Sequence, residues 1–405
     1  MSVRKKVMAA VCVIALLFCN GCGAAKPAGE PPAKKPAAQN LSGDCTVGVW
    51  ISFSEINAML KSPDGFKSQF DAVLQNCLSV GTKDLYVHVR AYCDSLFPSE
   101  NFPLIEEARG YDYDVFEYIV SACNSAGIRV HAWINPYRVL GSSGDISYLE
   151  ESSPARRWLS DDDPANDNNV CLYNGIYLNP AEPAVQQLVI DGIREILTKY
   201  AVDGIHFDDY FYPTTDEAFD SVSYEAYRQT ADNPLSLSGW RVANVNALIS
   251  GCYTAVKFMD KDIIFSVSPM ASITKNLDEL YADVGAWIEN GCVDVIIPQL
   301  YFGFEYPLAE FTFPGLLKEW KELAKRNGEV ALIIGLAPYK IGTDAPNDAL
   351  EWNLRTDIIA RQAQICKEDK RVAGFVLFSY TGTFSDNELN VKQRDNLKNT
   401  LNNAY

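Results

Sequence analysis

Three things that this sequence lacks narrow its range of functions before any motif is considered. It has only three histidines in 405 residues and no His-x-His pair, so a histidine-rich metal centre is disfavoured. Positive charge is scarce, because 35 Lys and Arg face 52 Asp and Glu for a net charge of −17. Nucleic acids select clustered positive charge, so we expect no nucleic-acid partner. No stretch has about 18 uninterrupted apolar residues, which leaves no candidate for a transmembrane helix.

Two further absences concern cysteine and glycine spacing. The chain has 11 Cys, three of them in the first 22 residues, and the rest are scattered without a Cys-x-x-Cys pair. Cys77 and Cys123 fall on the apolar faces of predicted helices. We therefore expect mostly buried free thiols, with one or two disulfides left open for an exported chain. No Gly-rich phosphate loop follows any predicted strand, which argues against a nucleotide-binding open sheet.

The first residues have the pattern of an export signal. Residues 4–6 are basic and precede an apolar run from Val7 to Phe18. That run is shorter than the roughly 20 residues that a membrane helix needs. Residues 19–22 read CNGC and are similar to a lipobox, in which a small residue precedes a cysteine that is lipidated after cleavage. We predict lipidation at Cys22, with an ordinary cleaved signal peptide as the alternative.

These features divide the chain into three parts. Residues 1–22 are predicted as a lipoprotein signal peptide, and 23–43 as a Pro- and Ala-rich tether without apolar periodicity. Residues 44–405 are predicted as one folded domain. We therefore expect an exported protein that a lipid holds at the extracytoplasmic face of the cell membrane.

The body of the chain alternates short apolar runs with longer helical patterns. Eight runs are predicted as strands, each followed by a helical stretch, and glycines at 81, 127 and 291 end three of these stretches. The stretches near Leu277–Asn290 and Leu350–Lys367 are each predicted as one helix. Eight βα units in succession predict a (β/α)8 TIM barrel with elongated βα loops, and a doubly wound open sheet is the fallback. The predicted strands are Val47–Ile51, Asp84–Arg90, Arg129–Ile134, Gly204–Asp208, Ile263–Val267, Val293–Gln299, Val330–Gly335 and Gly374–Phe378.

Strand alternation assigns one face of three strands to the inside of the barrel. The face that packs on helices should be apolar, and valines, isoleucines, Ala132 and Phe207 provide it. The other face carries all three histidines of the chain. The residues predicted to point inward are His88, Arg90, His131, Trp133, Asn135, His206 and Asp208. We interpret the histidines as a buried network that orients Asp208 and Arg90 rather than as a metal site.

The fourth predicted strand ends in two adjacent carboxylates, Asp208 and Asp209. Cleavage of a glycosidic bond needs an acid that protonates the leaving oxygen and a second group that stabilises positive charge on the sugar. Two crowded carboxylates cannot both ionise freely, so the pKa of one rises, as an acid catalyst requires. We predict both as catalytic, and a hydrogen-bonded pair that only fixes the loop is the alternative. Glu305 and Asp94 are reserve acids, because both lie in loops at the same end of the barrel.

Polar and aromatic residues near the strand ends are suited to hold a sugar. Gln299 and Tyr301 follow the sixth strand and carry hydrogen-bonding groups, and flat aromatic rings pack well on sugar rings. For each aromatic the alternative is packing in the core. The predicted substrate-binding residues are Arg90, Trp133, Asn135, Tyr137, Tyr210, Gln299 and Tyr301.

Several longer runs, taken in order, resemble the glycosyl-hydrolase-like 10 family of bacterial surface barrels. The runs are VHAWINPYRV (130–139), YLNPA (177–181), VDGIHFDDYFYPT (202–214), FSVSPM (265–270), VIIPQLYF (295–302) and IGLAPYK (334–340). The resemblance covers roughly residues 44–385 and implies an exported or lipid-anchored (β/α)8 glycoside hydrolase. Some members are associated with cutting peptidoglycan glycan strands stripped of their peptides. The family's strand acids fall on Asp208 and Asp209.

The fourth strand also resembles the DGxDxDxE signature of family 18 chitinases. Asp203, Gly204 and Asp208 match this signature. His206 and Tyr210 stand where the signature has an Asp and the acid-catalyst Glu, so the chitinase acid has no counterpart here.

The sequence thus predicts a glycoside hydrolase that cleaves cell-wall (peptidoglycan) glycan strands or a related polysaccharide by carboxylate acid/base chemistry. The alternative is a non-catalytic carbohydrate-binding surface lipoprotein, which a missing partner carboxylate would favour. A metal-dependent deacetylase is a third class, disfavoured by the lack of paired histidine ligands. We expect a monomer without a cofactor, whose partners are a polysaccharide and, through Cys22, the membrane.

Overall fold

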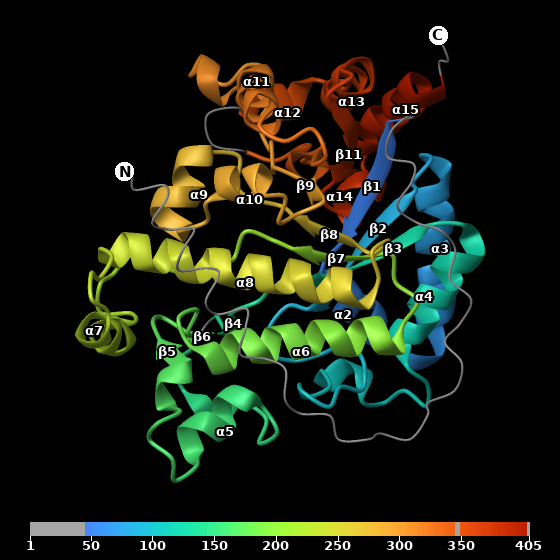
Figure 1. Ribbon diagram of the computed structural model, residues 1–405. Coiled ribbons are helices and arrows are strands. Elements are labelled where there is room, and N and C mark those ends of the chain that lie inside the picture. Colours follow the sequence, from blue (N-terminus) through green and yellow to red (C-terminus); the bar gives the residue numbers. More distant parts are fainter. Residues whose placement is uncertain (1–44, 142, 345–348, 403–405) are drawn as a thin grey trace. The chain divides into compact units, whose positions relative to one another are not determined.

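The computed structural model describes residues 45–141, 143–344 and 349–402. The predicted signal peptide, the tether and Cys22 lie outside these residues. In the described part, eight parallel strands close into a barrel in the order β1-β11-β10-β9-β8-β7-β3-β2, and helices separate them along the chain (Figure 1). The predicted (β/α)8 barrel is confirmed, and the open-sheet fallback is wrong.

The barrel strands lie where the apolar runs predict them. The second and third have the predicted bounds, whereas the sixth is regular over only two residues, after which Gln299 continues the pairing through isolated bridges. Pro298 interrupts this strand because proline has no N–H to donate. The strands are β1 (Thr46–Ile51), β2 (Asp84–Arg90), β3 (Arg129–Ile134), β7 (Gly204–Phe207), β8 (Ile264–Val267), β9 (Val295–Ile296), β10 (Ala331–Leu336) and β11 (Val372–Leu377).

The helices between the strands end at the signals that the sequence carries. In α4 (Val115–Ala126) the Asp114 carboxylate accepts the backbone N–H groups of Phe116 and Glu117, and Gly127 ends the helix with φ +74°. Gly81 and Gly291 also have positive φ, of +70° and +62°. The main shell helices are α2 (Phe53–Leu60), α3 (Phe66–Ser79), α4, α6 (Pro183–Lys199), α8 (Leu237–Met259), α11 (Phe313–Ala324), α13 (Ile358–Glu368) and α15 (Glu388–Asn402).

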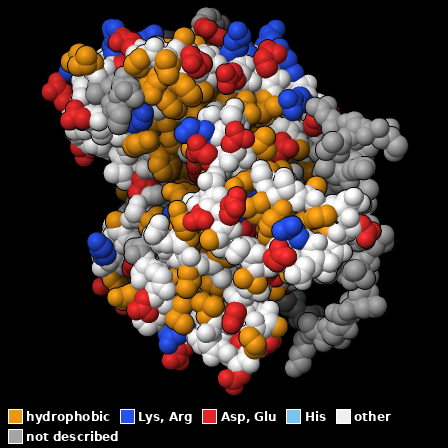
Figure 2. All heavy atoms as spheres, turned by 90° about the vertical axis from the view of Figure 1, so that its left-hand side faces the viewer, with side chains coloured by type: hydrophobic (Ala, Val, Ile, Leu, Met, Phe, Trp, Pro, Cys, Tyr) orange, Lys and Arg blue, Asp and Glu red, His pale blue; other side chains and the backbone are white. Residues whose placement is uncertain are grey.

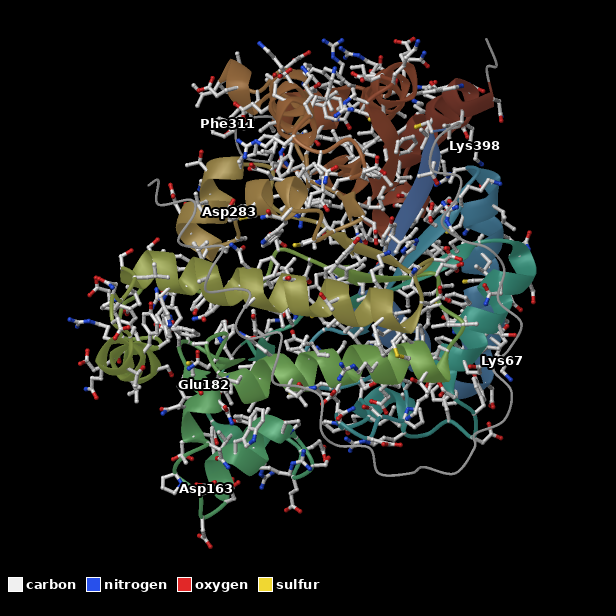
Figure 3. The ribbon with its side chains drawn as sticks, viewed as in Figure 1. Lys67, Asp163, Glu182, Asp283, Phe311 and Lys398 are labelled. Carbon is white, nitrogen blue, oxygen red and sulfur yellow. The ribbon has the colours of Figure 1, made fainter. Side chains whose placement is uncertain are left out.

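Two helical stretches predicted as continuous are broken in the structure. The stretch near Leu277–Asn290 divides into α9 (Ile273–Leu280) and α10 (Val284–Glu289), because Tyr281 adopts the left-handed conformation with φ +56°. Asp283, labelled in Figure 3, starts the second piece by accepting the N–H of Ala286 at 2.9 Å. The stretch near Leu350–Lys367 likewise divides into α12 (Ala349–Leu354) and α13.

The chain forms additional elements after β3, β7 and β8, at the carboxyl ends of the strands. They include α5 (Pro154–Ser160), α7 (Ser221–Thr230), α9, and a sheet of β4 (Arg138–Leu140), β6 (Ile176–Leu178) and β5 (Val170–Leu172). These elements lie on the left-hand side of Figure 1. Glu182, labelled in Figure 3 at the start of α6, accepts a hydrogen bond from Ser223 of α7 at 2.5 Å. Figure 2 looks onto this side and shows a hollow bordered by hydrophobic side chains.

Two hydrophobic clusters form the core. The larger one lies between the strands and the helices, and the smaller one fills the barrel. Large rings dominate the smaller cluster, so the barrel interior is packed rather than hollow. Its members are Trp50, Tyr86, Trp133, Ile264, Val295, Ile297, Ile333 and Val376.

The cysteines of the described part are free thiols, and six of these eight are buried. This agrees with the expectation of mostly buried thiols. Of the helices in the described ranges, none combines the length and apolar character that crossing a membrane requires.

Candidate active site

The three histidines of the chain all lie inside the barrel, as strand alternation predicts. His88, His131 and His206 are 5%, 1% and 0% exposed. They occupy two levels. His88 and His206 share one level, because both are in register with Trp133, whereas His131 pairs with Tyr86 lower in the barrel. In the part of the chain that the structure describes, no three His, Cys, Asp or Glu side chains gather as a metal ion would require.

At the amino end of the strands, His131 belongs to a charged cluster around Asp84. His131 Nε2 donates to Asp84 Oδ1 at 2.9 Å, and the Arg129 guanidinium donates to both oxygens at 2.6 and 2.7 Å. Thr46 adds a hydrogen bond at 2.6 Å. Burial alone would raise the pKa of Asp84, but the hydrogen bonds from His131 and Arg129 lower it below its ordinary value.

His206 is a neutral ring in the middle of the barrel. Burial holds its pKa well below the ordinary value of histidine. Trp50 Nε1 donates to His206 Nε2 at 3.0 Å, so the ring proton stays on Nδ1 and donates to Ser266 at 2.8 Å. The ring is thus fixed in orientation directly below Asp208 along β7.

Asp208 lies at the end of β7 and is 3% exposed. Trp133 Nε1 donates to Asp208 Oδ2 at 2.9 Å, and the backbone N–H of Tyr210 donates to Oδ1 at 3.2 Å. Burial, and next the negative charge of Asp209, raise the pKa of Asp208 to about 7, although both hydrogen bonds oppose this shift. The carboxyl group is therefore protonated in about half of the molecules near neutral pH.

His88 reaches Asp208 through Trp133. The two rings stack with centroids 3.7 Å apart and an interplanar angle of 8°. The His88 ring nitrogens are buried, and neither has a hydrogen-bond partner among the described residues. Burial, and next the charge of Arg138, hold the pKa of His88 well below its ordinary value, so the ring is neutral. His88 thus supports Asp208 through its packing on Trp133. Among the described residues, no histidine ring has a hydrogen bond to Asp208 or Arg90, so the predicted network does not orient these two residues directly.

Asp209 is less buried than Asp208 and lies near Gln299 and Tyr301, which follow β9. Gln299 Nε2 donates to Asp209 Oδ1 at 3.0 Å and to the Ser268 carbonyl at 2.9 Å. Burial raises the pKa of Asp209, and the Gln299 hydrogen bond opposes the rise. The charge of Asp209 in turn helps burial to raise the pKa of Tyr301 well above its ordinary value. Gln299 and Tyr301 therefore lie near Asp209.

Arg90 does not face the barrel interior, so that prediction is wrong. The register of β2 against β3 shifts between His88 and Arg90, which is a bulge that reverses alternation. The Arg90 guanidinium lies 4.2 Å from the Phe102 ring centroid, against helix α6 at Gly192. It therefore supports the helical shell and is 3% exposed.

The prediction for Tyr137 is also wrong. Asn135 Oδ1 accepts the backbone N–H groups of Tyr137 at 3.3 Å and Arg138 at 3.0 Å, which turns the chain after β3. Tyr137 enters the hydrophobic core and is 1% exposed, with no face left for a sugar. Asn135 itself is buried, and its Nδ2 has no partner among the described residues.

Arg138, which sequence reasoning did not single out, takes the place expected for Arg90. Its guanidinium lies 4.4 Å from the Tyr92 ring centroid and 4.6 Å from that of Tyr210. Its charge lowers the pKa of both Asp208 and Asp209, against the larger effect of burial. The Asn-Pro-Tyr-Arg turn after the third strand was the available signal, since turn residues after a barrel strand face the site.

The aromatic residues of the site form two groups. Tyr210 is 52% exposed and, with Tyr92, flanks Arg138 on one side of the acids. On the other side, Tyr301 stacks on Phe378 with centroids 5.6 Å apart and meets Tyr339 edge-on at 5.8 Å. Trp133 has its ring covered by His88 and is 7% exposed, so it holds Asp208 rather than offering an open face.

The two reserve acids are placed differently from the strand pair. Glu305 is half-exposed and forms an ion pair with Arg355 at 2.6 Å. Burial raises the pKa of Asp94 to about 6, with the charge of Glu107 adding to the rise. Asp209 and Arg138, rather than these acids, carry the charges that most affect Asp208. The arrangement at β7 can hold one proton between two carboxyl groups, which is what acid catalysis at a glycosidic oxygen requires.

Comparison with known proteins shows the family to which the chain belongs. The glycosyl hydrolase-like 10 family matches residues 46–353 of the chain. The chain is 29% identical to the glycosyl hydrolase YngK of Bacillus subtilis in an alignment of length 350 that covers 79% of this chain and 66% of that protein. It is 26% identical to the glycosyl hydrolase DigH of Escherichia coli K12 over 90% of each chain.

Solved structures share the fold at low sequence identity. The glycoside hydrolase domain of PgaB (BpsB) from Bordetella bronchiseptica superposes with a TM-score of 0.57 at 12% identity, over 87% of this chain and 98% of that one. The catalytic domain of β-amylase from Paenibacillus polymyxa also gives 0.57, at 10% identity over 88% and 97%. At such identities the likeness concerns the (β/α)8 fold alone.

Proposed function

Because the chain belongs to the glycosyl hydrolase-like 10 family, we propose that it is a glycoside hydrolase acting on a polysaccharide at the carboxyl end of the barrel. The observation that carries this proposal is the pair of carboxyl groups that ends β7. Asp208 is buried beside Asp209 and has a pKa of about 7. A carboxylic acid that keeps its proton at neutral pH is the group that protonates a leaving glycosidic oxygen.

In this mechanism Asp208 is the acid. Trp133 and the Tyr210 backbone hold its two oxygens, so the carboxyl group has a fixed orientation before substrate arrives. Preorganisation of this kind lowers the barrier because no group has to reorient in the transition state. After the proton leaves, the Asp208 carboxylate is stabilised by the same two hydrogen bonds.

Asp209 stabilises the positive charge that develops on the sugar. It is more exposed than Asp208, and the Gln299 hydrogen bond favours its ionised form. An oxocarbenium-like transition state carries positive charge at the anomeric carbon, which a nearby carboxylate attracts. Tyr210 and Tyr301 stand on either side of the pair and supply ring surface for the sugars.

We further propose that the substrate is the glycan of the bacterial cell wall or a related polysaccharide, reached by a protein that a lipid at Cys22 holds at the membrane. The amino-terminal signal pattern supports the location. The names of the bacterial relatives, both glycosyl hydrolases, support the reaction class.

The test is digestion of purified peptidoglycan, with and without its stem peptides, followed by mass spectrometry. New reducing ends support hydrolysis, and anhydro ends indicate a lytic reaction instead. Binding without products indicates a carbohydrate-binding protein and contradicts the proposal. Aryl glycosides sharpen the role of Asp208: Asp208→Asn should lose least activity on leaving groups that need no proton, whereas Asp209→Asn should lose activity on all of them.

The anchor is tested separately. Cys22→Ala should release the protein from membranes or block its processing, because the lipid attached to this cysteine supplies the membrane affinity. Fractionation after a salt wash measures this. A variant that stays with the membranes would show that lipidation at Cys22 is wrong.

A further inference from the structure

Tyr339 is an exposed aromatic residue at the catalytic end that the proposed mechanism does not use. It lies in η6 (Pro338–Lys340), directly after β10, and is 42% exposed. Among the described tyrosines only Tyr148, Tyr210 and Tyr339 are exposed. Because η6 follows the carboxyl end of a barrel strand, Tyr339 belongs to the face at which barrel enzymes bind their substrates.

The ring of Tyr339 is held by neighbours from two other strand ends. The Tyr301 and Phe378 rings meet it at 81° and 90°, with centroids 5.8 and 5.7 Å away. The Tyr339 backbone N–H donates to the Phe378 carbonyl at 3.4 Å, and a Cβ at Gly382 would lie 2.6 Å from the Tyr339 nitrogen. The ring therefore has a fixed position before a ligand arrives, and a fixed ring loses little conformational entropy on binding.

Tyr339 and Tyr210 stand on opposite sides of the barrel mouth. The Tyr210 ring packs 4.6 Å from the guanidinium of Arg138, which follows β3. In the closed barrel, β9, β8 and β7 separate β10 from β3 on one path, and β11, β1 and β2 separate them on the other. The two strands are therefore diametrically opposed, and the acids at the end of β7 lie between them on the first path.

A continuous row of side chains joins the acids to Tyr339. Gln299 Nε2 donates to Asp209 Oδ1 at 3.0 Å. Burial, and next the charge of Asp209, raise the pKa of Tyr301 well above its ordinary value, so Tyr301 is near this acid. Tyr301 in turn contacts Tyr339. A sugar chain that is cleaved at the acids and runs toward β10 therefore passes Tyr301 and reaches Tyr339, one ring farther out.

We propose that Tyr339 forms a second sugar-binding subsite, which stacks on a sugar ring of the polysaccharide across the acids from Tyr210. A tyrosine has an apolar ring face and a hydroxyl at its edge, and a sugar ring likewise has apolar C–H faces and hydroxyls at its edge. The subsite favours glycans that extend beyond the cleaved bond over shorter ones. This inference rests on the proposed hydrolase function and adds a determinant of chain length to the same site.

A rival role for Tyr339 is to support Tyr301 through their edge-on contact. In that case, removal of the Tyr339 ring disturbs Tyr301 for every substrate, and short and long glycans lose activity equally. A ring that binds a distant sugar affects only the glycans that are long enough to reach it. The dependence of activity on chain length therefore separates the two roles.

The experiment measures kcat/KM for oligosaccharides of increasing length, prepared from peptidoglycan glycan without its stem peptides. The full-length protein is compared with Tyr339→Ala, Tyr339→Phe and Phe258→Ala. Phe258 is a matched control, because it is 85% exposed but lies at the end of α8, which leads to the amino end of β8. For the unmodified protein, kcat/KM should rise by about 10-fold once the chain reaches Tyr339, mainly through a lower KM.

Tyr339→Ala should lose this rise, whereas Tyr339→Phe, which keeps the ring, should retain most of it. Phe258→Ala should behave as the unmodified protein. Circular dichroism checks folding, and Tyr339→Leu replaces Tyr339→Ala if the alanine variant is unfolded, since leucine keeps apolar bulk without a flat ring. An equal loss on all lengths in the folded variant, or no dependence on length in the unmodified protein, overturns the proposal.

Failure of the hydrolase function has a different signature. If no oligosaccharide is cut, the hydrolase function fails, and calorimetric binding of the longest oligosaccharide still decides the role of Tyr339. Weaker binding by Tyr339→Ala than by Tyr339→Phe supports the subsite. Equal or absent binding overturns it.

Discussion

Two carboxylates inside the same barrel are almost equally buried and yet differ in their protonation. Asp84, at the amino end of β2, is 2% exposed, and Asp208, at the carboxyl end of β7, is 3% exposed. Asp84 receives hydrogen bonds from two groups that can carry positive charge, Arg129 and His131, and its pKa falls. Asp208 receives two uncharged N–H donors, stands beside a second acid, and its pKa rises to about 7.

Burial raises the pKa of both carboxyl groups, and only the hydrogen bonds from His131 and Arg129 reverse that rise at Asp84. At the amino end of the barrel, Arg129 and His131 donate hydrogen bonds to Asp84, and this cluster contributes to stability. At the carboxyl end, Asp208 has no positively charged hydrogen-bond donor, so its ionised form is disfavoured. This costs stability and makes a proton available for acid catalysis. This division agrees with the general placement of barrel active sites at the carboxyl ends of the strands.

The largest effect is expected from Asp208→Asn. The substitution keeps the shape of the side chain and removes the proton donor, so kcat/KM for glycan cleavage should fall by roughly 10²- to 10⁴-fold. The folded protein should persist, because an amide is cheaper to bury than a crowded acid. Near-native turnover in this variant together with an inactive Glu305→Gln would place the active site at another strand. A loss of stability in both Asp208→Asn and Asp209→Asn would favour a loop-fixing pair.

At the other end, Asp84→Asn should mainly lower stability. The substitution leaves Arg129 and His131 without their buried counter-charge, and breaking a buried pair in this way costs about 3–5 kcal/mol of unfolding free energy. Urea unfolding measures it, with the exposed Asp64→Asn as a matched control that should change little. Activity per folded molecule should stay near that of the unmodified protein. A stable but inactive variant would contradict the division between the two ends.

A smaller effect is expected from Gln299→Met. Loss of the amide donor removes the hydrogen bond that opposes the rise of the Asp209 pKa, so less Asp209 is ionised at neutral pH. We expect kcat to fall by about 10-fold, since a hydrogen bond to a charged group is worth roughly 1.5–3 kcal/mol. The acidic limb of the pH–rate profile should move to higher pH. An unchanged acidic limb would show that Gln299 does not act through Asp209.

The smallest effect concerns the pH dependence of stability. The folded-state pKa of Asp208, about 7, is above its unfolded value, so the native state holds a proton that the unfolded chain has released between about pH 4 and 7. The contribution of Asp208 to stability is therefore full below this range and is lost as the pH rises through it. The Tm of Asp208→Asn should match that of the unmodified protein near pH 4 and exceed it by a few degrees above pH 7. A constant Tm difference across the range would contradict the raised pKa.

Strand alternation placed most of the interior correctly. His88, His131, Trp133 and His206 lie inside the barrel, because β2, β3 and β7 keep a regular period of two through these positions. The sequence likewise indicated the acids at the end of β7, since a carboxylate pair that directly follows an apolar barrel strand is typical of a functional site.

Alternation failed at two points where the backbone leaves the regular strand. The bulge before Arg90 turns that side chain into the helical shell. The turn after Asn135 places Arg138, instead of Tyr137, beside the acids. A bulge depends on how a strand pairs with its neighbour, which a single strand's residues do not reveal. Arg90 was therefore wrongly predicted at the site, and Arg138 was not predicted there at all.

The sequence by itself determined the barrel, its inward histidines and the position of the acid pair, because periodicity and strand ends are local properties of the chain. Only the tertiary structure decided which of the two buried acids meets a positively charged group. Asp84 meets Thr46 from β1 and Arg129 from β3, whereas Asp208 meets the indole of Trp133 and the charge of Asp209. Protonation follows from such neighbours, and closure of the barrel brings them together from distant parts of the chain.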